Sequence, residues 1–224
     1  MTIRARLYAA IVVAVAGLAL TVGTAIWGMS NLSDHFDRVQ RAADDRALAL
    51  QLKFDVTDFN GWQTAYGYDD GKSRPIFLNS VRRFRSDFAR TKAQLTRPEA
   101  GQPLGDLSKA FDDFMRLDAV AWKALRTGQK EVVRRLFLGP EITNFQRAAR
   151  AAQALAAAED AHAGRQEKEF RDARKDALRF LIGAAILAAL LVVILLVTAT
   201  DLARSAERAL EQQPPPKQPR ESEG

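Results

Sequence analysis

Hydrophobic and polar positions divide this chain into two uncharged stretches separated by a long segment in which charged residues recur. No Asp, Glu, Lys or Arg occurs from Leu7 to Ser33 or from Phe180 to Thr200. About 20 apolar residues allow a helix to cross the hydrocarbon core of a bilayer. The pattern therefore predicts transmembrane helices at residues 7–28 and 179–200, with the lipid bilayer as a partner.

The first apolar stretch has a second interpretation. A secretory signal peptide would also begin with a basic end and an apolar run, with Gly23-Thr24-Ala25 as its cleavage site. Signal peptides usually carry about 7–15 apolar residues, fewer than this stretch contains. The length favours an uncleaved anchor.

Between the two stretches, apolar residues recur at spacings of three and four, which is typical of helices with one buried face. Turn-forming Gly and Pro residues gather at 69–75, at 97–103, and at Thr127-Gly128 followed by Gly139-Pro140. We therefore predict an all-α protein: an antiparallel up-down-up-down four-helix bundle whose helices 1 and 4 continue into the two transmembrane helices. The predicted core stripes contain Leu32, Phe36, Val39, Ala43, Leu52, Val56, Phe59 and Tyr66; Phe77, Val81, Phe84, Phe88 and Leu95; Leu104, Leu107, Phe111, Phe114, Ala121 and Leu125; and Ile142, Phe145, Ala149, Ala152, Leu155, Phe170 and Ala177.

Charge near the apolar stretches bears on topology. Arg4 and Arg6 precede the first stretch and favour a cytoplasmic N-terminus. The basic residues at 165–179, on the domain side of the second stretch, would by the same rule place that side in the cytoplasm. Long domains translocate largely regardless of their charge, so the first stretch should dominate. We expect a two-pass plasma-membrane protein with both termini cytoplasmic. Its parts are a tail at 1–6, a transmembrane helix at 7–28, an extracytoplasmic sensor-like domain at 29–178, a transmembrane helix at 179–200 and a short Pro-rich tail at 201–224.

Small residues recur along one face of the first apolar stretch at spacings of four and three, which permits close helix packing in lipid. The partner helix is either the second stretch of the same chain or a symmetry mate. The predicted packing face consists of Ala10, Ala14, Gly17, Thr21, Thr24 and Gly28.

Composition argues against several functions. The 224 residues include no cysteine, which excludes disulfides and thiolate chemistry, and the net charge of +6 is spread too thinly to predict nucleic-acid binding. The only histidines, His35 and His162, form no metal-binding motif and are expected to pack or lie at the surface. We therefore expect no enzyme activity, catalytic residue, metal or cofactor.

One segment, residues 55–69, concentrates aromatic and amide side chains at the end of the first predicted domain helix. Such side chains suit a small polar ligand or a partner helix, although they could equally close the end of the core. Arg82 or Arg85 could face an anionic ligand or simply lie at the surface. The candidate ligand-binding residues are Asn60, Trp62, Gln63 and Tyr66.

Two stretches carry a family resemblance, which covers about residues 5–200. The first is FNGWQTAYGYDDGKSRPIFLNSVRRFRSDFA, with the motif Asn60-Gly61-Trp62-Gln63; the second is FDDFMRLDAVAWKALRTG followed by LFLGPEITNFQRAARAAQALAA. They resemble the four-helix-bundle sensor half of methyl-accepting chemotaxis receptors. The resemblance implies an extracytoplasmic sensor domain that signals by small helix displacements.

The chain departs from that family after the second apolar stretch. Family members continue there into a HAMP linker and a signalling coiled coil, whereas about 24 residues follow here, with Pro214-Pro215-Pro216 among them. We therefore expect a sensor module without its own signalling output, acting as a homodimer or through a partner membrane receptor. The alternative is a constitutive membrane scaffold or protein-interaction protein, including a truncated receptor remnant.

Overall fold

The computed structural model describes residues 3–211, and every element in this range is helical. The prediction of an all-α protein is confirmed for this part of the chain. The end of the predicted Pro-rich tail, residues 212–224, lies outside the described residues. The elements are α1 (Ile3–Tyr68), α2 (Arg74–Gln94), α3 (Pro98–Arg126), α4 (Lys130–Leu136), the π-helical turn η1 (Phe137–Glu141) and α5 (Ile142–Glu211).

The chain forms two compact units. One consists of residues 34–171, and the other combines 1–33 with 172–224. The first unit falls inside the segment 29–178 that the sequence assigns to a sensor-like domain, and the second contains both apolar stretches. Helices α1 and α5, 66 and 70 residues long, each contribute to both units.

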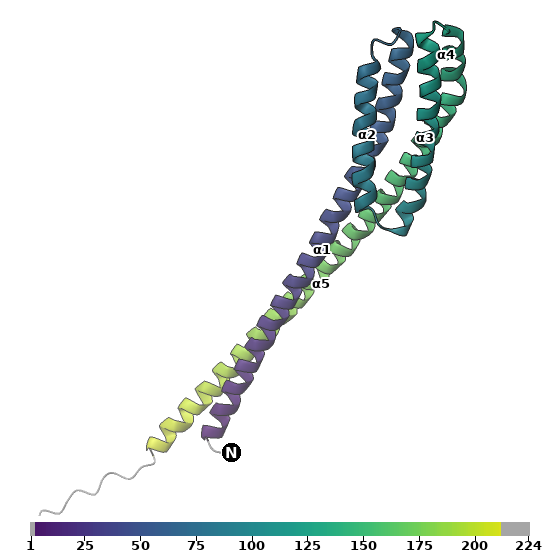
Figure 1. Ribbon diagram of the computed structural model, residues 1–224. Helices are drawn as coiled ribbons and strands as arrows, with labels where there is room; N and C mark the ends of the chain where they lie inside the picture. The colour runs from purple at the N-terminus through teal and green to yellow at the C-terminus, as the bar shows by residue number, and fades with distance from the viewer. Residues whose placement is uncertain (1–2, 212–224) are drawn as a thin grey trace, which may run out of the picture. The chain divides into compact units, whose positions relative to one another are not determined.

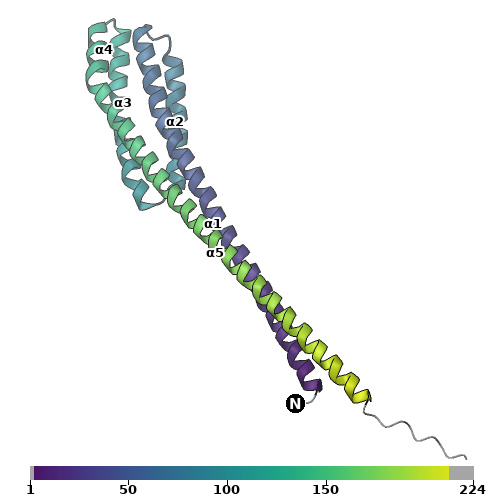
Figure 2. The same cartoon turned by 180° about the vertical axis from the view of Figure 1, so that it is seen from behind.

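Within residues 34–171, segments of α1, α2, α3 and α5 lie side by side around one apolar core, as the two opposite views show (Figures 1 and 2). Phe59 of α1 is fully buried at its centre. Its ring centroid lies 5.3 Å from that of Phe84, 5.5 Å from Phe111 and 5.0 Å from Phe114. Helix α5 contributes mainly alanines to this core, and their small side chains allow the aromatic rings to fill the interior.

The turn between α1 and α2 follows from its residue types. Asp70 and Gly71 have φ angles of 56° and 91°, in the left-handed region that glycine adopts at little cost. The Asp69 carboxylate accepts hydrogen bonds from the Ser73 hydroxyl at 2.5 Å and from the Ser73 amide at 3.2 Å. These bonds fix the reversal just before α2 begins.

The second predicted break is shorter than expected. Helix α3 begins at Pro98 and continues through Pro103, although the sequence predicts a turn over 97–103. Pro98 suits the first helical position, where its missing N–H would have no intrahelical partner. Pro103 removes only one hydrogen bond near the helix start, and Leu104 and Leu107 beyond it are buried in the core.

The Gly139-Pro140 pair also forms no break. It lies inside the π-helical turn η1, which joins α4 to α5 without a loop. A proline has no N–H to donate and its ring crowds the preceding turn, so a locally widened helix is one way to continue the chain past it. This turn ends at Glu141, whose side chain is buried.

The unit of 1–33 and 172–224 contains the apolar stretches. Each of α1 and α5 includes a window long and apolar enough to cross a membrane, and neither window is buried within the protein. The Trp27 and Phe180 rings meet edge to face at 6.3 Å. At Gly17, an added methyl group would overlap the Leu191 side chain, so the absent side chain lets Leu191 approach α1.

Candidate functional site

A buried polar network lies where α1 ends and α2 begins. Its centre is Asp118 of α3, whose side chain is 1% exposed. The Arg74 guanidinium donates two hydrogen bonds to this carboxylate, at 2.6 and 2.7 Å. The Tyr66 hydroxyl donates at 2.5 Å and the Gln63 amide at 3.2 Å. Asp118 is therefore a buried charge with an ionic partner and two further donors, as such charges require.

Aromatic rings hold the arginine of this network in place. The Arg74 guanidinium carbon lies 4.7 Å from the ring centroids of Tyr66 and Phe77 and 5.0 Å from that of Trp122. These are cation–π distances, which stabilise a guanidinium without neutralising its charge. Burial and the Asp118 carboxylate raise the pKa of Tyr66, so its hydroxyl keeps its proton and remains a donor.

A cavity of about 410 Å³ lies beside this network, within residues 34–171. Its volume falls in the range of about 300–1,000 Å³ that small-ligand pockets occupy. Most of the wall is apolar, and its polar groups come from α1, α4 and η1. The lining includes Asn60, Gln63, Leu125, Lys130, Arg134, Phe137, Leu138, Glu141 and Phe145.

Glu141 is the unusual member of the lining. Its side chain is 2% exposed, and among the described residues neither carboxyl oxygen accepts a hydrogen bond, although the Gln63 amide lies near enough to lower its pKa. Burial raises the pKa of Glu141 to about 8, and the nearby Asp118 charge adds to the shift. The Gln63 amide and the Arg74 guanidinium oppose this shift only in part. At neutral pH the protonated form of Glu141 is therefore favoured.

Every cation beside the cavity already has an acidic partner. Arg74 is committed to Asp118, and Lys130 pairs with Asp70 at 2.7 Å. Arg134 pairs with Glu131, one turn earlier on α4. Among the described residues, no ion-pair partner remains for Glu141.

Two glycines allow aromatic side chains to approach the end of α1. A methyl group at Gly67 would overlap the Phe137 ring, which forms part of the cavity wall. At Gly71, an added Cβ would lie 2.8 Å from the Trp122 ring. Gly61, by contrast, has no neighbouring atom within 4 Å. Gly67 therefore has a packing role that the exposed Gly61 lacks.

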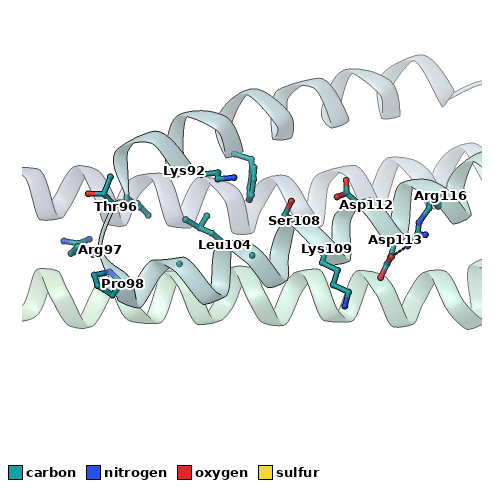
Figure 3. A pocket seen from close by; sticks show the side chains of 14 residues that line it. Lys92, Thr96, Arg97, Pro98, Leu104, Ser108, Lys109, Asp112, Asp113 and Arg116 are labelled. Carbon is teal, nitrogen blue, oxygen red and sulfur yellow. Dashed lines mark hydrogen bonds and ion pairs between the residues drawn. The ribbon is translucent and has the colours of Figure 1, made fainter.

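A second hollow, of about 780 Å³, lies along the end of α2 and the beginning of α3 (Figure 3). Its charged side chains are exposed or paired. Arg97 binds Asp45 at 3.1 Å and the buried Glu159, and Asp113 pairs with Arg116, as the dashed line in Figure 3 marks. The pKa of Glu159 is raised because burial outweighs the attraction of Arg97. This cluster ties α1 and α5 to the turn before α3.

The structure separates the four residues that the sequence singles out as a ligand site. Asn60 and Gln63 line the cavity. Tyr66 is fully buried behind it, with its hydroxyl bonded to Asp118. Trp62 is half-buried against the core and does not contribute to the cavity wall. Tyr66 and Trp62 therefore pack in or against the core, whereas Asn60 and Gln63 face a hollow.

The arginines considered for an anionic ligand lie elsewhere. Arg82 is exposed and donates to Asn79 on its own helix. The Arg85 guanidinium lies 5.6 Å from the Phe111 ring. Neither residue lines the cavity beside Glu141.

The small-residue face of α1 is partly covered. Ala14, Gly17, Thr21 and Gly28 are half-buried, whereas Thr24 is exposed. Its neighbour Ala25 is half-buried instead. Ala25 follows Thr21 by four residues, and in this part of α1 it lies on the same side of the helix as Thr21. The side chain of the remaining predicted member, Ala10, lies outside the described residues.

Both histidines are half-buried in the unit of 34–171. His35 has a buried Nδ1 without a hydrogen-bond partner. Burial lowers the pKa of His162, and the cations Arg97 and Arg165 lower it further, so the ring is neutral at pH 7. In the part of the chain that the structure describes, no three metal-ligating side chains gather.

Asp118 and Glu141 are not among the residues that the sequence predicts for the site, although a signal for Asp118 exists. Asp118 occupies a position in the apolar stripe of α3, between Phe114 and Ala121, where a charge must be buried. Gln63 interrupts the stripe of α1 in the same way. Polar residues at stripe positions would have identified this network. Glu141 has no such signal, because it lies in the π-helical turn, where the helical spacing changes.

No protein-family model matches this chain, and the comparisons with curated proteins and with solved structures find no match.

Proposed function

We propose that this protein is a membrane-anchored sensor module that binds a small ligand in the cavity beside Glu141. The observation that carries the proposal is the cavity itself, which combines apolar walls, amide groups and one buried carboxyl group without a partner. Native proteins leave few buried polar groups unsatisfied, and a ligand that pairs with this carboxyl group would account for the exception. We propose binding without chemical conversion of the ligand.

The architecture fits a sensor of this kind. In our proposal, residues 34–171 form an antiparallel up-down-up-down four-helix bundle, and α1 and α5 continue from it into two transmembrane helices. The protein is then a two-pass plasma-membrane protein with cytoplasmic termini and an extracytoplasmic bundle, similar to the sensor half of chemotaxis receptors. Glu141 immediately precedes α5, so the ligand would contact the start of a helix that also contains an apolar stretch.

In this proposal the protein passes its signal to a partner, either a second copy or another membrane receptor. A ligand can shift a helix arrangement only by binding two arrangements with different affinity. Helix displacements of about 1–2 Å are sufficient in known switching proteins. The constitutive scaffold is the competing account, in which the bundle binds its partner regardless of any ligand.

The experiment uses the full chain in lipid nanodiscs and screens a collection of small metabolites for thermal stabilisation, since a ligand that binds only the folded state raises its stability. Leu138→Trp places a large ring at an exposed position of the cavity lining. Val120→Trp is the matched control, because Val120 is similarly exposed, at 52%, and does not line the cavity.

We expect hits that stabilise the wild type and Val120→Trp but not Leu138→Trp. If no compound distinguishes the two variants, the cavity is not a ligand site and the sensor proposal fails. A partner that co-purifies equally with all three proteins would then support the scaffold account.

A further inference from the structure

We infer that the cavity beside Glu141 selects a ligand that carries an ammonium group on an apolar body, and that Glu141 is the residue that recognises the cation. This inference rests on the proposed function, because it names the ligand class of the same cavity. It depends on three observations: the charge balance around the carboxyl group, the position of this group in the cavity, and the chemistry of the walls.

The charge balance leaves one carboxyl group without a cationic partner. Two buried carboxyl groups, Asp118 and Glu141, share the neighbourhood of a single guanidinium. Arg74 binds Asp118 through both of its terminal nitrogens and lies among three aromatic rings, so it is not free to turn to Glu141. An ammonium ion at Glu141 would supply the missing partner and stabilise the ionised carboxylate.

The other charged groups around the cavity do not provide Glu141 with a cationic partner. Helix α1 contributes the neutral groups Gln63 and Tyr66, and α3 contributes the negative Asp118. The cations of α4, Lys130 and Arg134, are 72% and 66% exposed and paired with Asp70 and Glu131. Glu141 thus offers two acceptor oxygens, and an ammonium group offers up to three donors.

The walls indicate what the ammonium group is attached to. Phe137 and Phe145 from η1 and α5 line the cavity together with Leu125, Leu138 and Ile142. Apolar and aromatic walls favour an alkyl or aryl body, and aromatic faces also attract cations. A carboxylate ligand is disfavoured, because it would bring a second negative charge close to the buried Asp118.

Binding should also depend on pH. Glu141 is protonated at neutral pH, because its pKa is raised to about 8. An ammonium ligand binds the ionised form, so Glu141 releases its proton on binding. The apparent affinity should therefore rise by up to about tenfold per pH unit from pH 6 to 8.

The test compares three probes of similar shape on the full chain in nanodiscs: phenethylammonium, 2-phenylethanol and 3-phenylpropionate. Calorimetry at pH 8 measures their affinities for the wild type, Glu141→Gln, and the control Glu167→Gln, which changes an exposed glutamate of α5 outside the cavity. Partition of the amine into the bilayer is the same for all variants. Far-UV circular dichroism verifies that each variant is helical, and Glu141→Asp keeps the charge if Glu141→Gln fails to fold.

We expect phenethylammonium to bind the wild type and Glu167→Gln at least tenfold more tightly than the alcohol or the carboxylate. Glu141→Gln should lose this preference, and Glu141→Asp should keep it with a weaker affinity. Equal binding of the amine to the wild type and to Glu141→Gln would overturn the inference, as would the absence of amine binding at pH 8.

These failures differ from a failure of the proposed function. If the alcohol or the carboxylate binds and Leu138→Trp abolishes the binding, the cavity remains a ligand site and only the ammonium class is wrong. If none of the probes binds, the ammonium inference fails, while the metabolite screen still decides whether the cavity binds ligands.

Discussion

At the scale of single residues, the site contains two carboxyl groups that are equally buried but differ in the hydrogen bonds that they accept. Asp118 accepts hydrogen bonds from Arg74, Gln63 and Tyr66, whereas Glu141 accepts none. Burying an ionised group without partners is costly, so the proton remains on Glu141. This difference can be measured without knowledge of any ligand.

The first prediction concerns the pH dependence of stability. Because its pKa is raised from 4.5 to about 8, Glu141 binds its proton more tightly in the folded state than in the unfolded state. The stabilisation from this proton is present below pH 4.5 and is lost as the pH rises toward 8. Between pH 5 and 9, the free energy of unfolding of the wild type should fall by about 4 kcal/mol relative to Glu141→Gln.

Chemical denaturation of both proteins in the same detergent, at several pH values, measures this difference. The other titrating groups, including Asp55 and Glu159 with their raised pKa values, are common to both proteins and cancel. Parallel pH profiles would mean that Glu141 is hydrated in the folded protein and that its pKa is not raised.

The second prediction uses two glycines of the same helix. Gly61→Ala should raise the free energy of unfolding by about 0.5–1 kcal/mol, because alanine favours a helix and the site is open. Gly67→Ala gains the same helix preference but forces the Phe137 ring to move, and overpacking typically costs about 1–3 kcal/mol. Thermal or chemical unfolding should therefore show that Gly61→Ala is more stable than the wild type and that Gly67→Ala is less stable than Gly61→Ala. The reverse order would show that Phe137 does not lie against Gly67.

At the scale of elements, the apolar stripes account for how the helices pack. Phenylalanines of α1, α2 and α3 meet in one cluster, and the fourth side of this core is formed by alanines of α5. Large residues on three helices and small residues on the fourth allow the side chains around Phe59 to pack closely. The register of α1 is therefore fixed by which of its phenylalanines points inward.

The third prediction tests this register. Phe59 is fully buried and Phe54, five residues earlier on α1, is 58% exposed. Phe59→Ala should lower the free energy of unfolding by about 3–5 kcal/mol, as large-to-small substitutions in cores do. Phe54→Ala should change it by no more than about 0.5 kcal/mol. Denaturation in the same detergent compares the two variants, and similar losses would indicate that α1 is rotated relative to this core.

Much of the element structure follows from the sequence, and its exceptions have local physical causes. Periodicity predicts the helices because burial of a stripe is a property of neighbouring residues. It does not predict that Pro103 stays inside α3 or that Gly139-Pro140 widens into η1, because both depend on the packing of the residues that follow. The network around Asp118 joins residues 44 to 55 positions apart, so their proximity exists only in the folded chain.

At the scale of the whole molecule, the proposal makes a claim about the membrane. Two apolar windows, one in α1 and one in α5, are long enough to span a bilayer and are not buried in the protein. An even number of spans would place both chain ends on the same side. The bundle of 34–171 would then lie on the opposite side, where an external ligand has access to the cavity.

The fourth prediction is this topology. A reporter active only outside the cytoplasm and one active only inside are fused in turn near Gln102, an exposed residue of α3, and after the C-terminus. The Gln102 fusion should report outside and the C-terminal fusion inside. An inside signal at Gln102 would contradict the sensor topology and favour a cytoplasmic scaffold.

The three aromatic rings around Arg74, those of Tyr66, Phe77 and Trp122, have a consequence for spectroscopy. The protein has three tryptophans: Trp27 in the apolar unit, and Trp62 and Trp122 in the unit of 34–171. The Trp122 ring lies 5.0 Å from the Arg74 guanidinium, and a fixed positive charge at this distance shifts the emission wavelength of an indole. With Trp27 and Trp62 changed to phenylalanine, the remaining fluorophore would report on the electric field of the buried network, so the chain contains its own optical probe of this site.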